Sequence, residues 1–263
     1  MVCLAGSVTC PFNEQELISI VANATKSKTK MKVATRFSHS IPKLVCPSGE
    51  DGLIICTKNL NHVVEIDAEA KTMTLESGVT LRQLISEAAK AGLALPYAPY
   101  WWGLTIGGIL GTGAHGSTLW SKGSSVHDYV VGLTIVSPGG FEYGYVKVRK
   151  LNDSDQDLNA AKVSLGVFGV ISQVTLKLQS MFKQSITYLS KNDSDCGDQV
   201  LVFGKQHEFA DMIWYPSQHK VVYRMDDRVS SDMSGNGLYD SIIFRATSPL
   251  TLAIIRTTGL LYI

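Results

Sequence analysis

The chain has 263 residues, of which 45% are hydrophobic and 18% are charged, and its formal net charge is +1. This length allows one large hydrophobic core or two modest ones. The near-neutral charge and the lack of a basic tract argue against a nucleic-acid-binding surface. No apolar run reaches membrane-spanning length, since the stretch from Pro249 to Ile263 is short and carries Arg256. The composition therefore favours a protein that acts on small molecules.

The first third of the chain predicts one helix followed by four strands. Asn13 to Glu16 has the composition of a capping box, and the apolar residues after it have helical spacing, so a helix should run from about residue 14 to 26. The polar segment 67–71 should turn the last two strands into a hairpin. The predicted strands cover residues 32–35, 53–57, 63–67 and 72–76.

The middle of the chain predicts a second capped helix and further strands. Thr80 suits the N-cap, Gln83 could reach back to it, and Gly92 suits the position after the last turn. The polar segment from Ser190 to Gln199 suggests a passage between domains. The predicted strands cover residues 130–136 and 141–146, a hairpin around 137–140, and then residues 170–178. Helices and strands mixed in this way favour an α+β class.

The segment from Gly107 to Ser117, GGILGTGAHGS, contains five glycines and a His-Gly-Ser end. Glycine allows positive φ and has no Cβ, so consecutive amide N–H groups can turn toward an anion without obstruction. We interpret the aromatic residues just before it as packing rather than chemistry. Those residues are Tyr97, Tyr100, Trp101 and Trp102. The segment predicts a loop that binds a diphosphate.

The stretch from Gly111 to Gly116 also fits the G-x-G-x-x-G pattern of nicotinamide dinucleotide-binding units. That pattern needs a preceding strand and a following helix. Here Pro96, Pro99 and aromatic residues precede it, and residues 117–125 are of types that disfavour a helix. An NAD(P)-dependent dehydrogenase is therefore the less favoured alternative.

Three ordered segments together resemble the FAD-binding domain of the vanillyl-alcohol oxidase superfamily. They run from Thr105 to Ser117, from Val126 to Val136 and from Val163 to Thr175. Within that superfamily the chain is most similar to the plant L-gulonolactone oxidase-like proteins. The run from His207 to Arg228 resembles the opening of their substrate domain. The resemblance covers about residues 12–245.

The resemblance implies an α+β, two-subdomain FAD-binding fold of the PCMH type, followed by the start of an incomplete α+β substrate (cap) domain. The FAD-binding domain would span residues 1–180, with subdomains at about 10–76 and 77–180. The partial aldonolactone oxidase substrate domain would span residues 181–263. FAD is the implied cofactor, and a sugar lactone is the implied small-molecule partner.

In such a fold two loops hold the FAD diphosphate, and here the second would follow the strand that begins at Lys32. Relatives usually carry glycines in that loop, and some attach the flavin through its histidine. This chain differs there, so linkage through His39 and no linkage stay equally open, while the Arg36 guanidinium could hold a phosphate bidentately. The implied cofactor-binding residues are Arg36, Phe37, Ser38, His39, Ser40, Thr105, Gly108, Thr112, Gly113, His115, Gly116, Ser117, Gly169, Val170 and Ile171.

The implied reaction is oxidation of a secondary alcohol on a 1,4-lactone such as L-gulono-1,4-lactone, in ascorbate formation, with oxygen or another acceptor. Relatives carry a catalytic His-Trp-containing segment further downstream than Ile263, so no catalytic base is assigned. Asp226, Asp227 and Arg228 form a dense charged group that we interpret as a solvated turn or salt-bridge cluster. A shortened, non-catalytic flavin-binding protein is the main alternative.

The cysteines and the N-terminus leave the compartment open. Three glycosylation sequons are meaningful only in a secreted chain, and the N-terminus lacks the basic region of a signal peptide. An odd number of cysteines without metal-ligand spacing predicts at least one unpaired thiol and no metal site. The cysteines are Cys3, Cys10, Cys46, Cys56 and Cys196.

Overall fold

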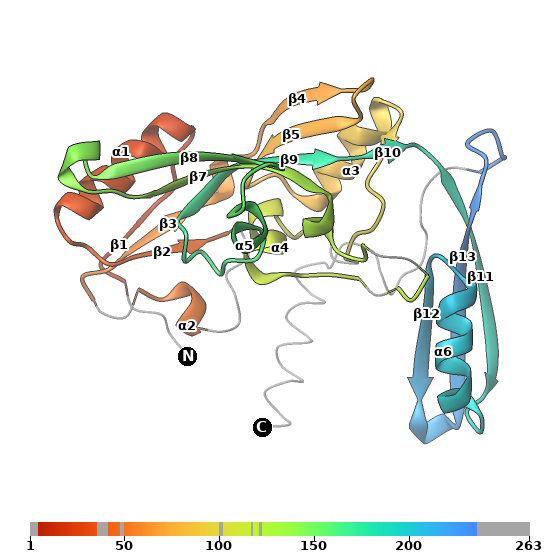
Figure 1. The fold of residues 1–263 in the computed structure, drawn as a ribbon. Coiled ribbons are helices and arrows are strands. Elements are labelled where there is room, and N and C mark those ends of the chain that lie inside the picture. Colours follow the sequence, from red (N-terminus) through yellow and green to blue (C-terminus); the bar gives the residue numbers. More distant parts are fainter. Residues whose placement is uncertain are drawn as a thin grey trace.

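A computed structural model describes residues 5–35, 42–47, 50–99, 102–116, 118–120 and 123–235. Its strands form a three-stranded parallel sheet, a five-stranded sheet, another three-stranded sheet and one short two-stranded pair. The first two sheets lie together, and the last three-stranded sheet stands to one side of them (Figure 1). This mixed architecture confirms the α+β class.

The parallel sheet contains strands β1 (Ser7–Thr9), β3 (Leu53–Cys56) and β2 (Met31–Ala34), in that order. Helix α1 (Glu14–Lys26) buries Leu17 and Val21, which pack with Ile55 of β3 and with Val136 and Val170 of the neighbouring sheet. One small core therefore joins the two sheets. The short helix α2 spans Pro42–Val45, and a 3-10 turn, η1, spans Thr57–Asn59.

The five-stranded sheet has the order β4-β5-β9-β7-β8, and every neighbouring pair in it is antiparallel. Its inner face packs against α3 (Leu81–Lys90) and α4 (Ile106–Thr112), so the largest apolar core lies between this sheet and these helices. A further short helix, α5, spans Leu158–Lys162. The strands are β4 (Val63–Asp67), β5 (Thr72–Glu76), β7 (Val130–Pro138), β8 (Val146–Asn152) and β9 (Val170–Lys177).

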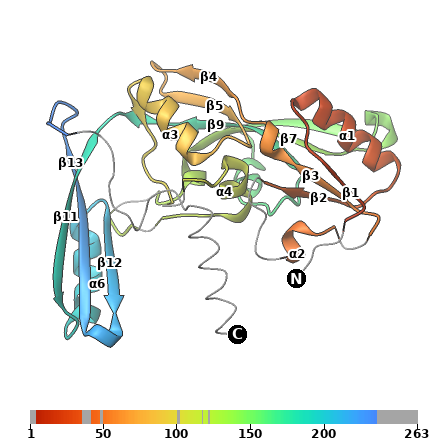
Figure 2. The same cartoon turned by 180° about the vertical axis from the view of Figure 1, so that it is seen from behind.

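The sheet that stands aside, which we call the cap sheet, has the order β11-β13-β12 and is antiparallel. Helix α6 covers one of its faces, where Phe203 packs against Val221 and Tyr223 (Figure 2). The pair β6–β10 connects the cap sheet to the rest. These elements are β6 (Leu93–Ala94), β10 (Gln179–Ser180), β11 (Lys183–Asn192), α6 (Cys196–Gln206), β12 (Ala210–Tyr215) and β13 (Lys220–Val229).

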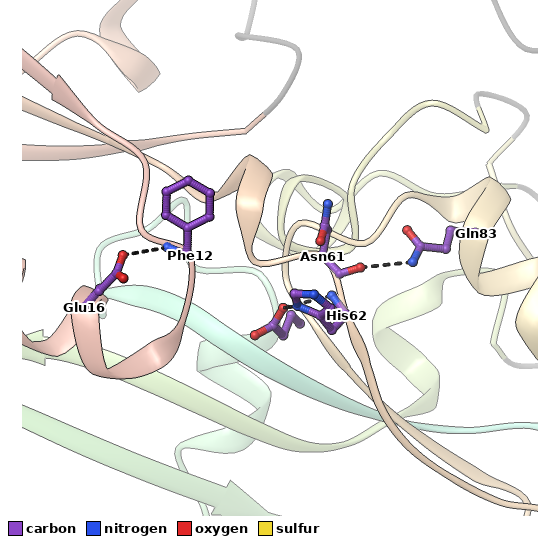
Figure 3. A network of polar contacts seen from close by, with 6 residues as sticks. Phe12, Glu16, Asn61, His62 and Gln83 are labelled. Carbon is purple, nitrogen blue, oxygen red and sulfur yellow. Dashed lines mark hydrogen bonds and ion pairs between the residues drawn. The ribbon is translucent and has the colours of Figure 1, made fainter.

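The two predicted helix caps are present, with one difference. The Asn13 side chain accepts from the Glu16 amide at 2.9 Å, and the Glu16 carboxylate accepts from the Phe12 amide (Figure 3). Thr80 caps α3 by accepting from the Gln83 amide at 3.2 Å. The Gln83 side chain does not reach back, because it donates to the Asn61 carbonyl at 3.0 Å instead (Figure 3). That contact ties α3 to the segment before β4.

The predicted strand over residues 141–146 is wrong. Phe141–Tyr143 form a 3-10 turn, and both Gly144 and Tyr145 have positive φ, so strand β8 begins only at Val146. Residues 141–144 are exposed, and no core contact holds them extended. The strand prediction treated the apolar Phe141 as a buried residue, but Phe141 is 80% exposed in the folded chain.

Two expected boundaries also differ from the sheet arrangement. The polar segment 190–199 does not connect two domains, because it contains the end of β11 and the start of α6. Strand β11 lies at the edge of its sheet and is largely exposed, which explains its polar residues. A subdomain limit was expected at about residue 76. Strands β4 and β5 instead belong to the five-stranded sheet, so sheet membership changes between Cys56 and Val63. No helix among the described residues is long and apolar enough to cross a membrane.

We expect Gly169→Ala to destabilise the fold by more than about 2 kcal/mol. Gly169 has a φ of +127°, and a Cβ there would lie 2.5 Å from the Val136 carbonyl oxygen. The matched control is Gly197→Ala in α6, where a Cβ would meet nothing within 4 Å. This variant should unfold as wild type does or be stabilised by up to about 1 kcal/mol. Urea denaturation compares the two, and equal stability would contradict the prediction.

Candidate functional site

A cavity of about 670 Å³ lies between the parallel sheet, the five-stranded sheet and helix α4. This volume is within the range of small-molecule and cofactor sites. The parallel sheet contributes strand β2 and the turn after β3, and the five-stranded sheet contributes the start of β9 and the end of β7. The lining residues that matter below are Lys32, Thr35, Thr57, Ser77, Thr105, Gly107, Gly108, Gly111, Thr112, Gly166, Gly169, Val170 and Ile171.

Helix α4 forms the floor of this cavity and replaces the first half of the loop predicted from the glycines. Thr105 caps it by accepting from the Gly108 amide, and Gly113 ends it with a φ of +65°. Ile106, Ile109 and Leu110 have helical spacing and are fully buried, so they anchor the turn in the main core. Burial of these three side chains overrides the low helix propensity of the glycines between them.

The glycines of α4 allow the helix to pack closely against the turn after β5, and they do not expose its first amide groups to a ligand. The amides of Ile106 and Gly107 donate to the carbonyls of Val79 at 2.9 Å and Ser77 at 2.8 Å, so the first turn already has protein partners. A Cβ on Gly107 would lie 2.9 Å from Cβ of Ser77. Only Gly111 has open space around its missing Cβ, with no atom within 4 Å. The helix therefore presents one uncrowded position to the cavity.

Two segments that are far apart in the sequence meet at the cavity. A Cβ on Gly108 would lie 3.4 Å from Cγ2 of Thr35, the last described residue before the second predicted loop. The rest of that loop lies outside the described residues. It contains the predicted positions Arg36, Phe37, Ser38, His39 and Ser40.

A third segment closes the cavity from the side of the five-stranded sheet. Leu165 and Gly166 have positive φ, and the Leu165 amide donates to the Gly111 carbonyl at 2.9 Å. Gly169 then allows the chain to pass against the Val136 carbonyl before β9 begins. Because these turns sit directly beside α4, Val170 and Ile171 reach the cavity wall.

The predicted site residues divide into two groups. Gly113, His115 and Gly116 are not in the cavity wall; His115 is exposed, and its Nδ1 lies 2.6 Å from the Gly116 carbonyl oxygen. Ser117 lies outside the described residues. Thr105, Gly108, Thr112, Gly169, Val170 and Ile171 do line the cavity. In the second half of the glycine segment, Ala114 therefore still lines the cavity, whereas Gly113, His115 and Gly116 do not.

Sequence reasoning missed two hydroxyl groups in the wall. Thr57 follows β3 and Ser77 follows β5, and they are 2% and 1% exposed. Neither hydroxyl has a hydrogen-bond partner among the described residues. A buried polar group without a partner costs roughly 1–3 kcal/mol, so such groups mark places where a partner is supplied from outside. The available signal was a hydroxyl-bearing residue directly after each of the strands β3 and β5.

The wall of the cavity is otherwise almost uncharged. Among the described lining residues, Lys32 on strand β2 carries the one full charge. The Thr112 hydroxyl is already used, because it donates to the Gly108 carbonyl at 2.9 Å. The cavity thus combines apolar walls with a few hydroxyl groups and one cation, a composition that suits a large ligand with both ring and phosphate parts.

A family model described as "FAD binding domain" matches residues 5–142, and this range contains α4 and most of the cavity. The chain belongs to the FAD-binding domain family. Its cavity is therefore the candidate binding site for a flavin nucleotide.

Relatives and solved structures agree with this assignment. The chain is 64% identical over 258 residues to probable L-gulonolactone oxidase 6 and 62% identical to L-gulonolactone oxidase 2, both from Arabidopsis thaliana. These matches cover 97% of this chain but only 43% and 44% of the relatives, so the chain spans less than half of their length. A cholesterol oxidase variant from Brevibacterium sterolicum superimposes with a TM-score of 0.76 at 20% identity, over 96% of this chain and 51% of that one. The PCMH-type fold expected from the sequence is thereby confirmed.

The charged group on the cap side of this FAD-binding protein is neither a turn nor one cluster. Its three residues are consecutive on β13 and pair with different partners. Asp226 pairs with Arg224, which also lies 3.3 Å from Asp211, while Asp227 lies 3.6 Å from His207. Burial raises the pKa of the Asp226 and Asp211 carboxyl groups, and the Arg224 guanidinium opposes that rise.

Aromatic residues join the cap sheet to the FAD-binding part. The Tyr97 ring lies 5.0 Å from Phe209 and 6.4 Å from Tyr129, centroid to centroid. Arg228 stacks on Phe182 and makes a bidentate pair with Glu208. The rings thus pack, as predicted for Tyr97, while Tyr100 and Trp101 lie outside the described residues; Trp102 lies against Arg82 at 5.8 Å.

We expect Ser77→Ala to leave the stability of the flavin-free protein unchanged or to raise it by about 1 kcal/mol, because the variant removes a buried hydroxyl that has no partner. The matched control is Ser172→Ala, since Ser172 is equally buried at 1% exposure but its hydroxyl lies 2.5 Å from a Glu14 carboxylate oxygen and 3.2 Å from the Thr134 carbonyl oxygen, either of which can accept its proton. This second variant should lose about 1–3 kcal/mol. Denaturant unfolding measures both, and a large loss in Ser77→Ala would refute the assignment of Ser77 as an unsatisfied group.

Proposed function

We propose that the chain binds FAD in the 670 Å³ cavity and that the protein oxidises a sugar 1,4-lactone with it. The observation that carries this proposal is a pair of buried hydroxyls, Thr57 and Ser77, which have no hydrogen-bond partner among the described residues and lie in the wall of a cavity inside a matched FAD-binding domain. Both hydroxyls would donate to phosphate or ribitol oxygens of the bound nucleotide. The uncrowded face of Gly111 provides the room for that ligand to approach the backbone.

The remaining contacts of the proposed site follow from the same wall. The Thr105 hydroxyl accepts from Gly108 and is free to donate its own proton to a ligand oxygen. Lys32 would offset part of the diphosphate charge. The second loop begins beside Gly108, so we propose that residues 36–40 complete the diphosphate site, with Arg36 acting as a bidentate phosphate donor.

The domain division follows the fold. We propose that residues up to about 180 form the FAD-binding unit and that β11–β13 with α6 begin the substrate domain. The Tyr97–Phe209 contact and the hydrogen bond from the Thr118 hydroxyl to the Glu208 carbonyl would set the orientation of this second unit. We assign no catalytic group among the described cap residues.

The reaction class is inferred from the relatives and from the flavin site. Bound flavin would supply an acceptor for the hydride of a lactone secondary alcohol and would pass the electrons to oxygen or another acceptor. The chain's own contribution would be to hold that flavin and, through the cap, to position the lactone against it. The names of the plant relatives point to L-gulono-1,4-lactone and hence to ascorbate formation.

The nicotinamide alternative loses its structural support. The G-x-G-x-x-G stretch from Gly111 to Gly116 lies at the end of a helix instead of between a strand and a helix. The next strand along the chain, β7, pairs antiparallel with both of its neighbours, whereas a nicotinamide-binding unit needs parallel strands. We therefore propose flavin rather than NAD(P) as the dinucleotide.

We expect the purified protein to retain FAD with its visible absorption bands, and Gly111→Leu to weaken flavin binding by at least about tenfold, or about 1.4 kcal/mol. The leucine side chain would enter the cavity, where nothing lies within 4 Å of the added Cβ. Gly197→Leu is the control, because it adds the same side chain to a helix away from the cavity. Fluorescence titration with FAD compares the variants.

Equal flavin affinity in the two leucine variants would contradict the assigned cavity.

Acid precipitation of the yellow protein distinguishes covalent from non-covalent attachment of the flavin. A coloured pellet that becomes colourless in His39→Ala would establish covalent linkage, and a colourless wild-type pellet would exclude it.

We expect oxygen uptake that depends on L-gulono-1,4-lactone when the flavin-loaded protein is assayed in an oxygen electrode. The control is the same preparation with the lactone omitted. Bound flavin without turnover, including no lactone-dependent bleaching under nitrogen, would overturn the proposed activity. That result would favour a non-catalytic flavin-binding protein. Thermal protection by NAD(P) but not by FAD would overturn the flavin proposal as a whole.

A further inference from the structure

Two cysteines outside the cavity face each other at the end of the parallel sheet. Strands β1 and β3 pair in parallel register, from Ser7 opposite Leu53 to Thr9 opposite Ile55. The next residue on each strand is a cysteine, Cys10 on one and Cys56 on the other. The ladder therefore ends on a pair of thiols.

The side chains of these cysteines lie on the same face of the sheet. Ile55 is fully buried toward α1, so its neighbours Ile54 and Cys56 point to the opposite face. Val8, which pairs with Ile54, is 63% exposed on that face, and Cys10 follows it by two positions. The register therefore places Cys10 beside Cys56 on this face, and burial together with the neighbouring Cys56 thiol raises the pKa of Cys10.

The spacing of the backbones suits a covalent bond between them. Neighbouring strands lie about 4.7–4.9 Å apart, and disulfides join Cα atoms that are usually about 4.4–6.8 Å apart. Both backbones are held in place: the Asn59 side chain donates to the Cys10 carbonyl at 3.1 Å, and Cys56 pairs with Ala34 on its other side. No large movement is needed to bring the sulfurs to bonding distance.

The pair is also chemically accessible. Both cysteines are free and only partly buried, so a small oxidant can reach them. Burial and the neighbouring Cys56 raise the pKa of Cys10 more than Lys58 lowers it, so the thiolate that attacks a disulfide forms more readily as the pH rises. Cys46 is disulfide-bonded already, and Cys196 lies on α6, away from this sheet. Among the described residues, Cys10 and Cys56 are therefore the pair poised for thiol chemistry.

We propose that Cys10 and Cys56 form a reversible disulfide, a modification site that links the first strand to the central strand of the parallel sheet. With a small-molecule disulfide such as oxidised glutathione as oxidant, the Cys10 thiolate attacks one glutathione sulfur and releases glutathione thiolate. The Cys56 thiolate then attacks the Cys10 sulfur of this mixed disulfide and releases the second glutathione. The two cysteine thiols lose two electrons, oxidised glutathione gains them, and the two thiol protons end on the two glutathione molecules.

The location gives the bond a structural consequence. Cys56 directly precedes Thr57, and Ala34, its neighbour on β2, also lines the cavity. A disulfide here would close a loop from residue 10 to residue 56 that contains α1 and β2. Because such a loop restricts the unfolded chain, oxidation should raise the midpoint of thermal unfolding.

The test is peptide mapping of the full chain after equilibration in glutathione buffers of increasing oxidation, followed by alkylation of the remaining thiols. Chymotrypsin is the suitable protease, because cleavage after Leu4 separates Cys3 from Cys10 and cleavage after Leu53 separates Cys46 from Cys56. Trypsin would leave Cys3 and Cys10 on one peptide and Cys46 and Cys56 on another, so it could not show which cysteines are joined. We expect a cross-linked peptide that joins Cys10 to Cys56 under oxidising buffer and that disappears with reduced glutathione.

Cysteine variants provide a second, independent test of the proposed disulfide. Cys10→Ser and Cys56→Ser should each abolish the cross-linked peptide and the oxidation-dependent rise in unfolding temperature, while Cys196→Ser should retain both. Full alkylation of Cys10 and Cys56 in the wild-type chain at every buffer ratio would overturn the proposal. So would a cross-link from either residue to a different cysteine. The mapping needs only wild-type protein, so the proposal stays testable even if a variant does not fold.

Discussion

The cavity of this protein depends on backbone segments that approach one another too closely for any side chain. A Cβ on Gly78 would overlap the Thr57 carbonyl, and one on Gly107 would overlap Ser77. At Gly169 the obstacle would be the Val136 carbonyl. The first two contacts join the parallel sheet, the turn after β5 and helix α4, and the third lies within the five-stranded sheet, so together they fix the backbone around the cavity. Larger residues at these three glycine positions would displace the backbone around the cavity, even though none of them would replace a ligand-binding side chain.

This close packing also decides which groups are left for a ligand. The amides of the first turn of α4 are used to bind the Ser77–Val79 turn, so they are not available to an anion. The hydroxyls of Thr57 and Ser77 remain, buried and without partners among the described residues. A glycine-rich segment can therefore serve a cofactor site indirectly, by letting neighbouring turns present their side chains. The family match to an FAD-binding domain agrees with a ligand that brings many acceptor oxygens.

The cap sheet contains a buried group of ion-paired side chains. Arg224 is 5% exposed and lies between Asp226 and Asp211, so a buried cation meets two carboxylates whose pKa values burial has raised. Ion pairs of this kind are costly to break, because one partner would be left buried and charged. The sheet is consequently a pre-formed unit that meets the FAD-binding part through aromatic rings, with Phe209 against Tyr97.

Local sequence determined the elements whose signals are local. The Asn13 and Thr80 caps, the strands β4, β5 and β9, and the helix α1 with its buried face appear where the pattern predicted them, since caps and amphipathic faces act within a few residues. The resemblance to a flavoprotein family was also readable. Tertiary structure alone decided that Ile106, Ile109 and Leu110 bury a glycine-rich stretch as a helix, and that Phe141 stays in solvent. It also decided that Thr57 and Ser77 meet at one cavity, because burial and the meeting of distant strand ends depend on how the sheets pack, which no local pattern records.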